Sequence, residues 1–452
     1  MSTEARVQHV TGPGWVADAI FWHVYPLGAV GAEATGDPDG PVVHRLPQLT
    51  AWLDHAVALG ANGLLLGPVF ASQTHGYDTV DHLRVDPRLG DDGDLDDLLA
   101  AATAAGVRVL LDGVFNHVGR DHPAFAAVLA QGPSAPTAGW FRLRWPGGAD
   151  AWEPGTEPEY DDFEGHHHLV ALDHTNPDVV EHVAHVMTHW LDRGAAGWRL
   201  DAAYAVPTGF WAQVADRVRA AHPDAYLLGE VIHGDYAGVV RDGHLDAVTQ
   251  YELWKAVWSS LNEGNFWELA HSLGRHAEFL DAFTPQTFVG NHDVTRIASR
   301  LEDERHLAHA VALLATTGGT PSVYYGDEHG FRGVKEDREG GDDAVRPALP
   351  AGPQDLSPLG QPVMDLHTEL LGLRRRHRWL HTARPSVLSV TDRRVVVASV
   401  GEGGERLLLA MSLEEEDVEL DAPGATEVLA GPGHLDGDVV RLPPHGWAVL
   451  AG

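Results

Sequence analysis

Carboxylates follow several apolar segments of strand length, at the point where each segment ends. Asp201 and Glu230 end the fourth and fifth of these segments, and Asp293 follows the seventh. In a barrel of parallel strands the C-terminal strand ends meet at one face, so we expect the three carboxylates to lie together. Retaining glycoside hydrolysis needs two such groups about 5–5.5 Å apart, because one attacks the anomeric carbon while the other protonates the departing oxygen.

A basic residue and two histidines accompany these carboxylates. Arg199 precedes Asp201 by two residues, so both side chains lie on the same face of a strand and the guanidinium can keep the carboxylate ionised. His117 and His292 can donate hydrogen bonds to sugar hydroxyls. Taken singly, a strand-end aspartate is more often a helix cap and a lone histidine a structural donor, so the prediction depends on the whole set.

Eight apolar segments, each followed by a stretch with helical spacing, would position these side chains. The alternation predicts an α/β fold built as a (β/α)8 TIM barrel, and no GxGxxG motif follows the first segment as a dinucleotide-binding sheet would require. Helices are predicted over Leu46–Leu59, Leu95–Ala105 and Pro177–Asp192. The strand segments are Ala19–Leu27, Gly63–Phe70, Val107–Phe115, Gly197–Ala203, Ala225–Val231, Leu245–Tyr251, Thr287–Asn291 and Ser322–Tyr325.

Two regions depart from this alternation. About fifty-five residues rich in Gly, Pro, Trp and acid separate the third strand from the helix at Pro177, far more than an ordinary loop. From about residue 379 the chain shows short alternating runs typical of antiparallel strands. We therefore predict a barrel over 1–118 and 174–378, an inserted subdomain over the active site at 119–173, and a C-terminal antiparallel β-sandwich at 379–452.

Composition narrows the classes of partner. The 452 residues contain 31 Lys+Arg and 65 Asp+Glu, a net charge of −34, which disfavours nucleic acids and anionic membrane surfaces and leaves neutral ligands. Cysteine is absent, so no disulfide or thiolate chemistry is available. Neither a signal peptide nor a membrane-spanning run is recognisable, and we expect a cytoplasmic protein. The oligomeric state is left open.

Seven short motifs together resemble the α-amylase family, glycoside hydrolase family 13. Four of them resemble the sequence signatures of this family, in the right order: DGVFNH, GWRLD, LLGE and GNHD, at 112–117, 197–201, 227–230 and 290–293. The others resemble its first strand, its loop after strand two and its eighth strand: FWHVYP, HGYD and YYGDE, at 21–26, 75–78 and 324–328.

The resemblance implies a role for each matching residue. Asp201 would be the nucleophile that forms a β-glycosyl-enzyme, Glu230 the general acid and then base, and Asp293 a carboxylate that holds sugar hydroxyls. The substrate-binding residues that it implies are Tyr25, Tyr77, Asp78, Asp112, His117, Arg199, His292 and Arg346.

Substrate choice is predicted from two further features. LVALDHTNP at 169–177 is similar to the fifth signature of the oligosaccharide-acting branches, which resemble neopullulanase and cyclomaltodextrinase. Asp78 and Arg346 fall where relatives that prefer short substrates place an acid–arginine pair that clamps the terminal glucose. A surface ion pair or a loop contact is the alternative reading of these two residues.

No cofactor is expected to be required. Two places in the sequence suggest a metal site, and at each the ligand set is incomplete. Asn116 and Asp173 match two ligand positions of the family's structural calcium, but Ala205 stands where a further ligand often lies, and calcium needs six to eight oxygens. The run His166–His168 is expected to line a loop, because adjacent residues cannot easily bind one ion together.

These features predict a retaining α-glucoside hydrolase that acts on α-glucans and malto-oligosaccharides, mainly at α-1,4 links. A transglycosylase, isomerising enzyme or phosphorylase would keep the same carboxylates and differ in what attacks the intermediate. A non-catalytic carbohydrate-binding or scaffold protein is a second alternative, although such proteins usually lack part of the carboxylate set.

Overall fold

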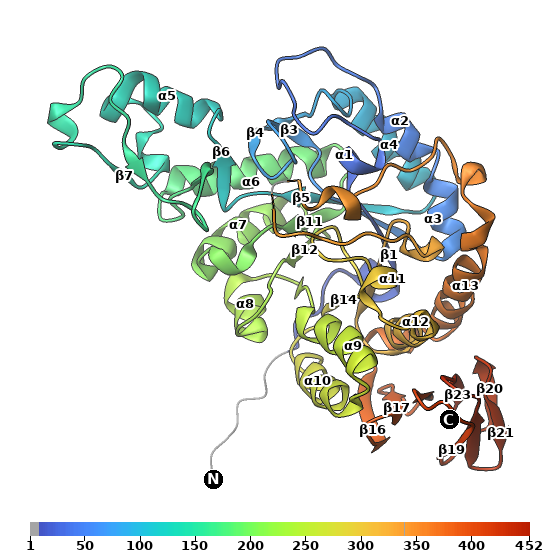
Figure 1. The fold of residues 1–452 in the computed structure, drawn as a ribbon. Coiled ribbons are helices and arrows are strands. Elements are labelled where there is room, and N and C mark those ends of the chain that lie inside the picture. The colour runs from blue at the N-terminus through green and yellow to red at the C-terminus, as the bar shows by residue number, and fades with distance from the viewer. Residues whose placement is uncertain (1–8, 339) are drawn as a thin grey trace, which may run out of the picture.

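A ring of parallel strands forms the centre of the computed structural model, which describes residues 9–338 and 340–452 (Figure 1). Within these ranges eight strands pair in the order β13-β12-β11-β5-β2-β1-β15-β14. A parallel bridge between Thr249 and Gln286 joins the two outer strands, so the sheet closes into a barrel. The strands are β1 (Phe21–Val24), β2 (Gly63–Leu66), β5 (Arg108–Gly113), β11 (Gly197–Leu200), β12 (Tyr226–Gly229), β13 (Ala247–Val248), β14 (Gln286–Phe288) and β15 (Thr320–Tyr324).

The predicted (β/α)8 barrel is confirmed, although its strands are shorter than the apolar segments. Each predicted segment overlaps one strand of the barrel, and β1, β2, β11 and β12 are buried along their whole length. Burial on both faces is expected where side chains fill the barrel and helices cover its outside. The segment Leu245–Tyr251 keeps only two residues in its strand, because Tyr251 already begins α9 (Tyr251–Glu263).

Helix ends follow the local capping chemistry. α6 (Pro177–Asp192) has the predicted bounds, and the Asn176 side chain accepts a hydrogen bond from the Asp178 N–H at 2.8 Å. α4 (Asp92–Ala104) begins three residues before its predicted start, because Asp91 and Asp94 form a reciprocal capping box. The further helices are α1 (Pro26–Ala29), α5 (Pro123–Gln131), α7 (Thr208–Ala221), α8 (Tyr236–Gly243), α10 (Phe266–Phe279), α11 (Ile297–Arg300), α12 (Leu307–Thr316) and α13 (Gln361–Arg376).

The single helix predicted over Leu46–Leu59 is wrong. The chain forms two helices there, α2 (Leu46–Thr50) and α3 (Leu53–Leu59). Between them Trp52 is fully buried, its ring stacks at 6.1 Å on Trp22, and its indole N–H donates to the Pro350 carbonyl at 3.3 Å. The break thus coincides with a tertiary contact that helical periodicity does not reveal.

Small sheets flank the barrel at its loops. After β2 comes an antiparallel hairpin of β3 (Phe70–Ser72) and β4 (Thr79–Val85), which the sequence analysis did not predict. The long insertion contains α5, a sheet in the order β6-β10-β9 and a second hairpin, β7-β8. Figure 1 shows this insertion projecting from the barrel beside α6 and β4. Its strands are β6 (His117–Gly119), β7 (Leu143–Arg144), β8 (Glu159–Tyr160), β9 (Asp162–Phe163) and β10 (His166–Ala171).

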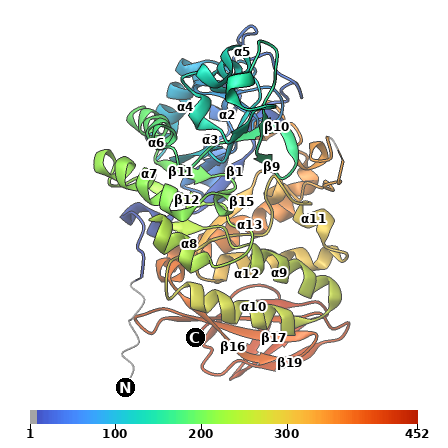
Figure 2. The ribbon, with the colours of Figure 1, turned by 90° about the vertical axis from the view of Figure 1, so that its left-hand side faces the viewer.

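The C-terminal strands form the predicted antiparallel sheet domain on the other side of the barrel, below α10 and α12 in Figure 2. One sheet has the order β16-β17-β18-β23-β20 and the other β19-β22-β21, with a buried cluster that includes Val396, Leu408 and Val440. The boundaries drawn at residues 118, 173 and 378 stay a prediction. The strands are β16 (Arg384–Val390), β17 (Arg394–Val400), β18 (Arg406–Ser412), β19 (Val418–Asp421), β20 (Glu427–Ala430), β21 (His434–Asp436), β22 (Val439–Leu442) and β23 (Trp447–Ala451).

The cap of α6 gives a stability prediction. Asn176 also donates from its side-chain amide to the Gly139 carbonyl in the insertion. Asn176→Ala removes both bonds and should lower the free energy of unfolding by about 1–2 kcal/mol, measured by urea denaturation. Asn176→Ser keeps a capping oxygen and should recover most of the capping loss; a serine variant no more stable than the alanine variant would contradict the capping argument.

Candidate active site

The predicted site residues gather at the C-terminal ends of the barrel strands. Asp201 and Glu230 directly follow β11 and β12, and Asp112 lies near the end of β5. Arg199 within β11 pairs in register with Asp112 on β5, which places the two side chains side by side. Parallel pairing of neighbouring strands therefore brings residues that are far apart in the sequence to one edge of the barrel.

Arg199 is the centre of the site. Its Nη1 donates to both Asp112 carboxylate oxygens at 2.7 Å and to Asp201 Oδ1 at 3.2 Å. Its Nη2 lies 2.8 Å from Glu230 Oε1 and 4.0 Å from Asp293 Oδ2. The side chain is 4% exposed, so one buried guanidinium holds four carboxylates together. Although burial acts to lower it, the pKa of Arg199 is raised by Asp112, Glu230 and Asp201, and the cation is permanent.

Asp201 and Glu230 are joined through the turn that follows β11. Ala202 has a φ of 46°, a left-handed conformation that is uncommon outside glycine, and its N–H donates to Glu230 Oε2 at 3.1 Å. Burial, followed by the charges of Glu230, Asp112 and Asp293, raises the pKa of Asp201 well above its ordinary value, against the opposing effect of Arg199. Asp201 therefore retains its proton to higher pH than an ordinary aspartate would.

Asp293 has the opposite electrostatic environment. It lies 2.9 Å from His292 Nε2 and accepts a hydrogen bond from Arg346 Nη2 at 2.9 Å. Burial acts to raise the pKa of Asp293, but His292, Arg346 and Arg199 outweigh it, and the pKa lies well below its ordinary value. The site thus contains carboxyl groups whose proton affinities are pushed in opposite directions.

Aromatic rings form one wall beside these carboxylates. The His292 ring is stacked between Tyr25, at 5.8 Å, and Tyr77, at 5.6 Å. The Tyr77 hydroxyl contacts His292 Nε2 and donates to Asp112 at 3.1 Å. Since Tyr77 is only half-buried, its ring is available to a ligand, whereas Tyr25 is buried. The predicted placement of these aromatics next to the carboxylates agrees with the geometry.

His117 lies behind this wall. Its Nε2 donates to the Tyr77 carbonyl at 3.0 Å, its Nδ1 accepts from the Asn116 amide at 3.1 Å, and its ring stacks on Phe163 of the insertion at 4.8 Å. Burial lowers the pKa of His117 to about 4. Both ring nitrogens have protein partners in this structure, so His117 holds Tyr77 in position.

Asp78 and Arg346 do not pair with each other in this structure, so the predicted clamp is not formed and Asp78 makes the loop contact that was the alternative prediction. Asp78 is buried and accepts from the Thr74 N–H at 3.1 Å and from the Thr74 hydroxyl at 2.7 Å, which closes its own loop. Arg346 instead binds Asp293 and Asp342, the latter at 3.0 Å, and its guanidinium lies 4.5 Å from the Tyr25 ring centroid. In this structure Asp78 thus contacts its own loop, and Arg346 contacts the two more exposed carboxylates.

The two residues predicted as possible calcium ligands do not fit calcium. Asp173 Oδ1 accepts from the N–H and hydroxyl of Thr175, at 3.1 and 2.8 Å, and the Arg142 guanidinium lies 3.5 Å away. The Asn116 amide is bonded to His117. Arg142 lines the same groove as Asn116 and Ala205, so a cation of the protein itself already stands beside the only predicted carboxylate ligand.

Sequence reasoning missed one group that touches the carboxylates. The Tyr251 hydroxyl donates to Glu230 Oε1 at 3.1 Å and accepts from the Asn291 amide at 2.8 Å. Tyr251 ends the sixth apolar segment, so the strand-end rule that found Asp201 could have found it. A small pocket is lined by this side chain together with His23, Arg199, Glu230, Asn291 and His292.

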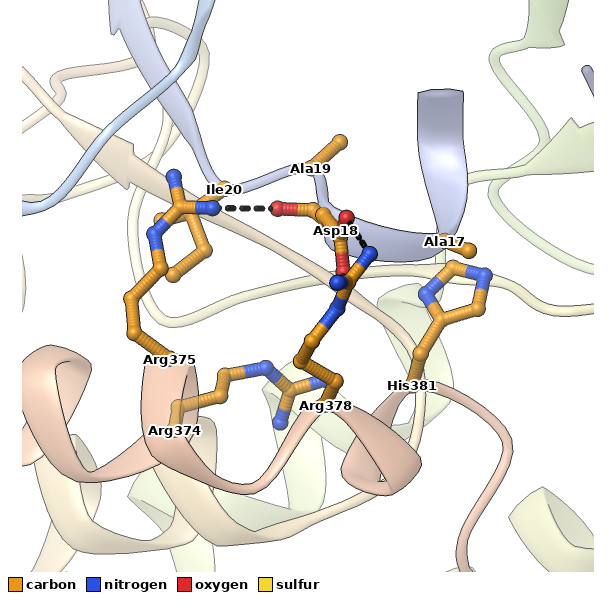
Figure 3. Close-up of a pocket in the computed structure, with 8 residues that line it drawn as sticks. All are labelled: Ala17, Asp18, Ala19, Ile20, Arg374, Arg375, Arg378 and His381. Carbon is orange, nitrogen blue, oxygen red and sulfur yellow. Dashed lines mark hydrogen bonds and ion pairs between the residues drawn. The ribbon is translucent and has the colours of Figure 1, made fainter. Parts of the chain in front are cut away.

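A larger cavity of about 200 Å³ lies at the opposite end of the barrel, before β1 (Figure 3). Three arginines line it. Arg375 donates to the Gly60 and Asp18 carbonyls, and Arg378 pairs with the Asp18 carboxylate. Arg374 donates to backbone carbonyls at the end of α12. These hydrogen bonds already use the guanidinium groups, so we do not place the substrate there.

Comparison with known proteins agrees with this geometry. A cyclomaltodextrinase of Bacillus sp. is 32% identical, over 71% of this chain and 61% of the relative's length. The intracellular maltogenic amylase of Bacillus subtilis is 27% identical, over 72% of this chain and 57% of the relative's length. The chain thus spans about three fifths of these relatives. The cyclic α-maltosyl-(1→6)-maltose hydrolase of Arthrobacter globiformis has been solved ligand-free and with maltose. Its ligand-free structure superposes on this chain with a TM-score of 0.82 and 27% sequence identity, and the match covers 97% of this chain and 100% of that one. The family model for the α-amylase catalytic domain matches residues 37–351. This chain therefore belongs to the α-amylase family.

Proposed function

We propose that this protein is a retaining α-glucoside hydrolase that acts on malto-oligosaccharides and related short α-glucans, mainly at α-1,4 links. The observation that carries the proposal is the set of four carboxylates around Arg199 at the C-terminal face of the barrel. The names of the relatives, a cyclomaltodextrinase and a hydrolase of a cyclic maltosyl-maltose, support short linear or cyclic substrates over long starch chains.

In the proposed reaction Asp201 attacks the anomeric carbon as the bond to the leaving oxygen breaks, and Glu230 gives that oxygen a proton. A covalent β-glycosyl-enzyme results. Water then attacks the same carbon, Glu230 takes the water proton, and the bond to Asp201 breaks. Two inversions at one carbon restore the α configuration. A catalytically silent binding protein is the less favoured reading, because the full carboxylate set is present.

The contacts of the two carboxyls support this division of work. In the free protein Glu230 contacts the Arg199 guanidinium, the Tyr251 hydroxyl and the Ala202 N–H, and Asp201 contacts the same guanidinium. Because the pKa of Asp201 is raised, the nucleophile must lose its proton before it attacks. Arg199 opposes that shift and favours the ionised form.

Asp293 is proposed to bind the hydroxyls of the sugar at the reaction centre. Its lowered pKa keeps it ionised, and an ionised carboxylate accepts strong hydrogen bonds from hydroxyl groups. His292 and Arg346 hold it from two sides, so little reorganisation is needed when the substrate binds. The half-buried Tyr77 ring beside them offers a face for the apolar side of the sugar.

The cytoplasmic location stays a prediction. The name of the intracellular maltogenic amylase of Bacillus subtilis supports it.

The two proposed catalytic carboxyls can be separated by the leaving group. Asp201→Asn should lower kcat/KM by at least about 10³-fold on every α-glucoside, because the nucleophile is lost. Glu230→Gln should lose about 10²–10⁴-fold on maltotriose, but far less on a nitrophenyl α-glucoside, whose leaving oxygen departs without a proton. Glu252→Gln, at an α9 carboxylate paired with Arg275, is the matched control and should keep activity. Equal losses of Glu230→Gln on both substrates would argue against its acid role.

The products distinguish hydrolysis from transfer. With maltotriose we expect glucose and maltose, and proton NMR should show the newly formed reducing end first as the α anomer. Maltose, isomaltose, sucrose, trehalose and a cyclic maltodextrin, each with and without inorganic phosphate, complete the panel. Dominant longer oligosaccharides, isomerised disaccharides or glucose 1-phosphate would overturn the hydrolase proposal in favour of a transfer reaction. A β anomer at the earliest times would contradict retention.

The pH profile tests the environment of Asp293. Arg346 helps to lower the pKa of Asp293, so Arg346→Gln should raise that pKa. Asp201 and Asp293 must both be ionised, and the pKa of Asp293 is the lower of the two, so Asp201 sets the start of the acid limb of kcat/KM and Asp293 sets the pH at which the limb steepens. This second break should move to higher pH by about 1 unit in Arg346→Gln. Asp342→Asn removes the other carboxylate on Arg346 and is the control, with the second break nearly in place. A second break that stays in place or moves to lower pH in Arg346→Gln would contradict this role.

A further inference from the structure

Three histidines from separate segments meet where the insertion joins the barrel. His82 lies on β4, His122 caps the start of α5, and His182 lies on α6. One nitrogen of each lies within 4.8 Å of one nitrogen of each of the others. His82 and His122 are buried and His182 is half-buried. The proposed reaction uses none of the three, and no carboxylate belongs to the cluster.

The rings are arranged as three imidazoles around a point. Their centroids are 5.9, 6.0 and 6.3 Å apart, close to an equilateral triangle, and the rings are tilted to each other by 56°, 74° and 81°. In a zinc site with Zn–N bonds of about 2.0–2.1 Å, imidazole centroids lie about 5.2–5.5 Å apart. A contraction of about 1 Å or less would therefore bring the three rings to bonding distance.

Two of the ring nitrogens are buried without a partner. Among the described residues, His82 Nδ1 and His182 Nε2 have no hydrogen bond. His82 Nε2 donates to the Val114 carbonyl at 2.9 Å, which fixes its proton there and leaves the Nδ1 lone pair free. A buried acceptor without a donor is costly, and such atoms need an explanation. A metal ion at the centre of the triangle would satisfy them.

The tautomer of His122 also bears on metal binding, because imidazole binds a metal through a nitrogen that carries no proton. His122 Nδ1 accepts from the Ala124 N–H at 3.2 Å, so binding through His122 Nε2 requires its other tautomer and the loss of that long hydrogen bond.

The surroundings are aromatic and hold the rings in place. His82 packs 5.3 Å from Phe115, and Trp140 of the insertion covers His182 at 4.8 Å. A second candidate group, which includes His306 and His445, differs because its two histidines are bonded to each other. His306 Nε2 is bonded to His445 Nδ1 at 2.8 Å, and His445 Nε2 lies 3.1 Å from Glu415.

We propose that His82, His122 and His182 form a binding site for one divalent transition-metal ion, with zinc preferred, that fastens the insertion to the barrel. Three neutral imidazoles are a ligand set that suits Zn²⁺, with the fourth position left for water. One ligand comes from the barrel hairpin, one from the insertion and one from the helix after it, so the ion would tie together segments that are 40 and 60 residues apart in the sequence. The role is structural, and it is independent of the proposed hydrolysis.

The test uses the full chain, stripped with a chelator and then dialysed against about 10 µM free Zn²⁺, a concentration at which a site of micromolar affinity or tighter fills. We expect one zinc per chain and a melting temperature that rises with zinc concentration. Co²⁺ in place of zinc should give the strong visible absorption of a tetrahedral ion. Activity on maltotriose is measured in parallel, and its outcome does not bear on metal binding.

Two substitutions and one control localise the ion. His182→Gln removes one ligand, and His122→Asn removes another while keeping an oxygen that caps α5. Each should weaken zinc binding by about 100-fold or more. His185→Ala, one turn further along α6 at an exposed position, should bind zinc like the unmodified chain.

Three results would overturn the proposal. The first is no zinc retained by the unmodified chain. The second is zinc bound by both ligand variants as tightly as by the unmodified chain. The third is a weakly absorbing, octahedral Co²⁺ spectrum, which needs no variant and so decides the matter even where a variant fails to fold.

Discussion

A single buried guanidinium organises the centre of this protein. Arg199 alone would be costly to bury, and four carboxylates alone would repel each other, so each is stable there only in the presence of the other. The pairing of β11 with β5 sets Arg199 opposite Asp112, and the turn at Ala202 directs an N–H at Glu230. The register of the barrel strands is therefore also the geometry of the site.

The carboxyl groups around Arg199 differ in pKa because each has different neighbours. The pKa of Asp293, which has His292 and Arg346 as additional partners, is lowered, and the pKa of Asp201, which faces mainly other carboxyls, is raised. The number of cationic partners around a carboxyl therefore decides how low a pH it can reach before it takes up a proton. The aromatic stack around His292 and the hydroxyl of Tyr251 then fix the side chains in their orientations.

Histidines that are adjacent in the sequence and histidines that are adjacent in space form different sets in this protein. The contiguous run His166–His168 attracts attention in the sequence, yet His167 contacts Asp162 at the surface, and no metal-binding group among the described residues includes the run. The cluster of interest comes from His82, His122 and His182, which no spacing rule connects. Adjacent residues on a strand point to opposite faces, whereas residues from three different elements can converge on one point.

Much of this protein could be predicted from the sequence because its information is local. Strand-length apolar runs predict the eight barrel strands, Asn176 predicts the start of α6, and polar residues at strand ends predict the carboxylate set. The partner of each charge was not predictable. Arg346 joins Asp293 while Asp78 accepts from Thr74, and Arg142 stands beside Asp173. Trp52, at the break between α2 and α3, donates to the Pro350 carbonyl. Local propensity determines which elements form and which side chains end them, but competition among distant groups for one hydrogen bond or one charge is decided only when the chain is packed.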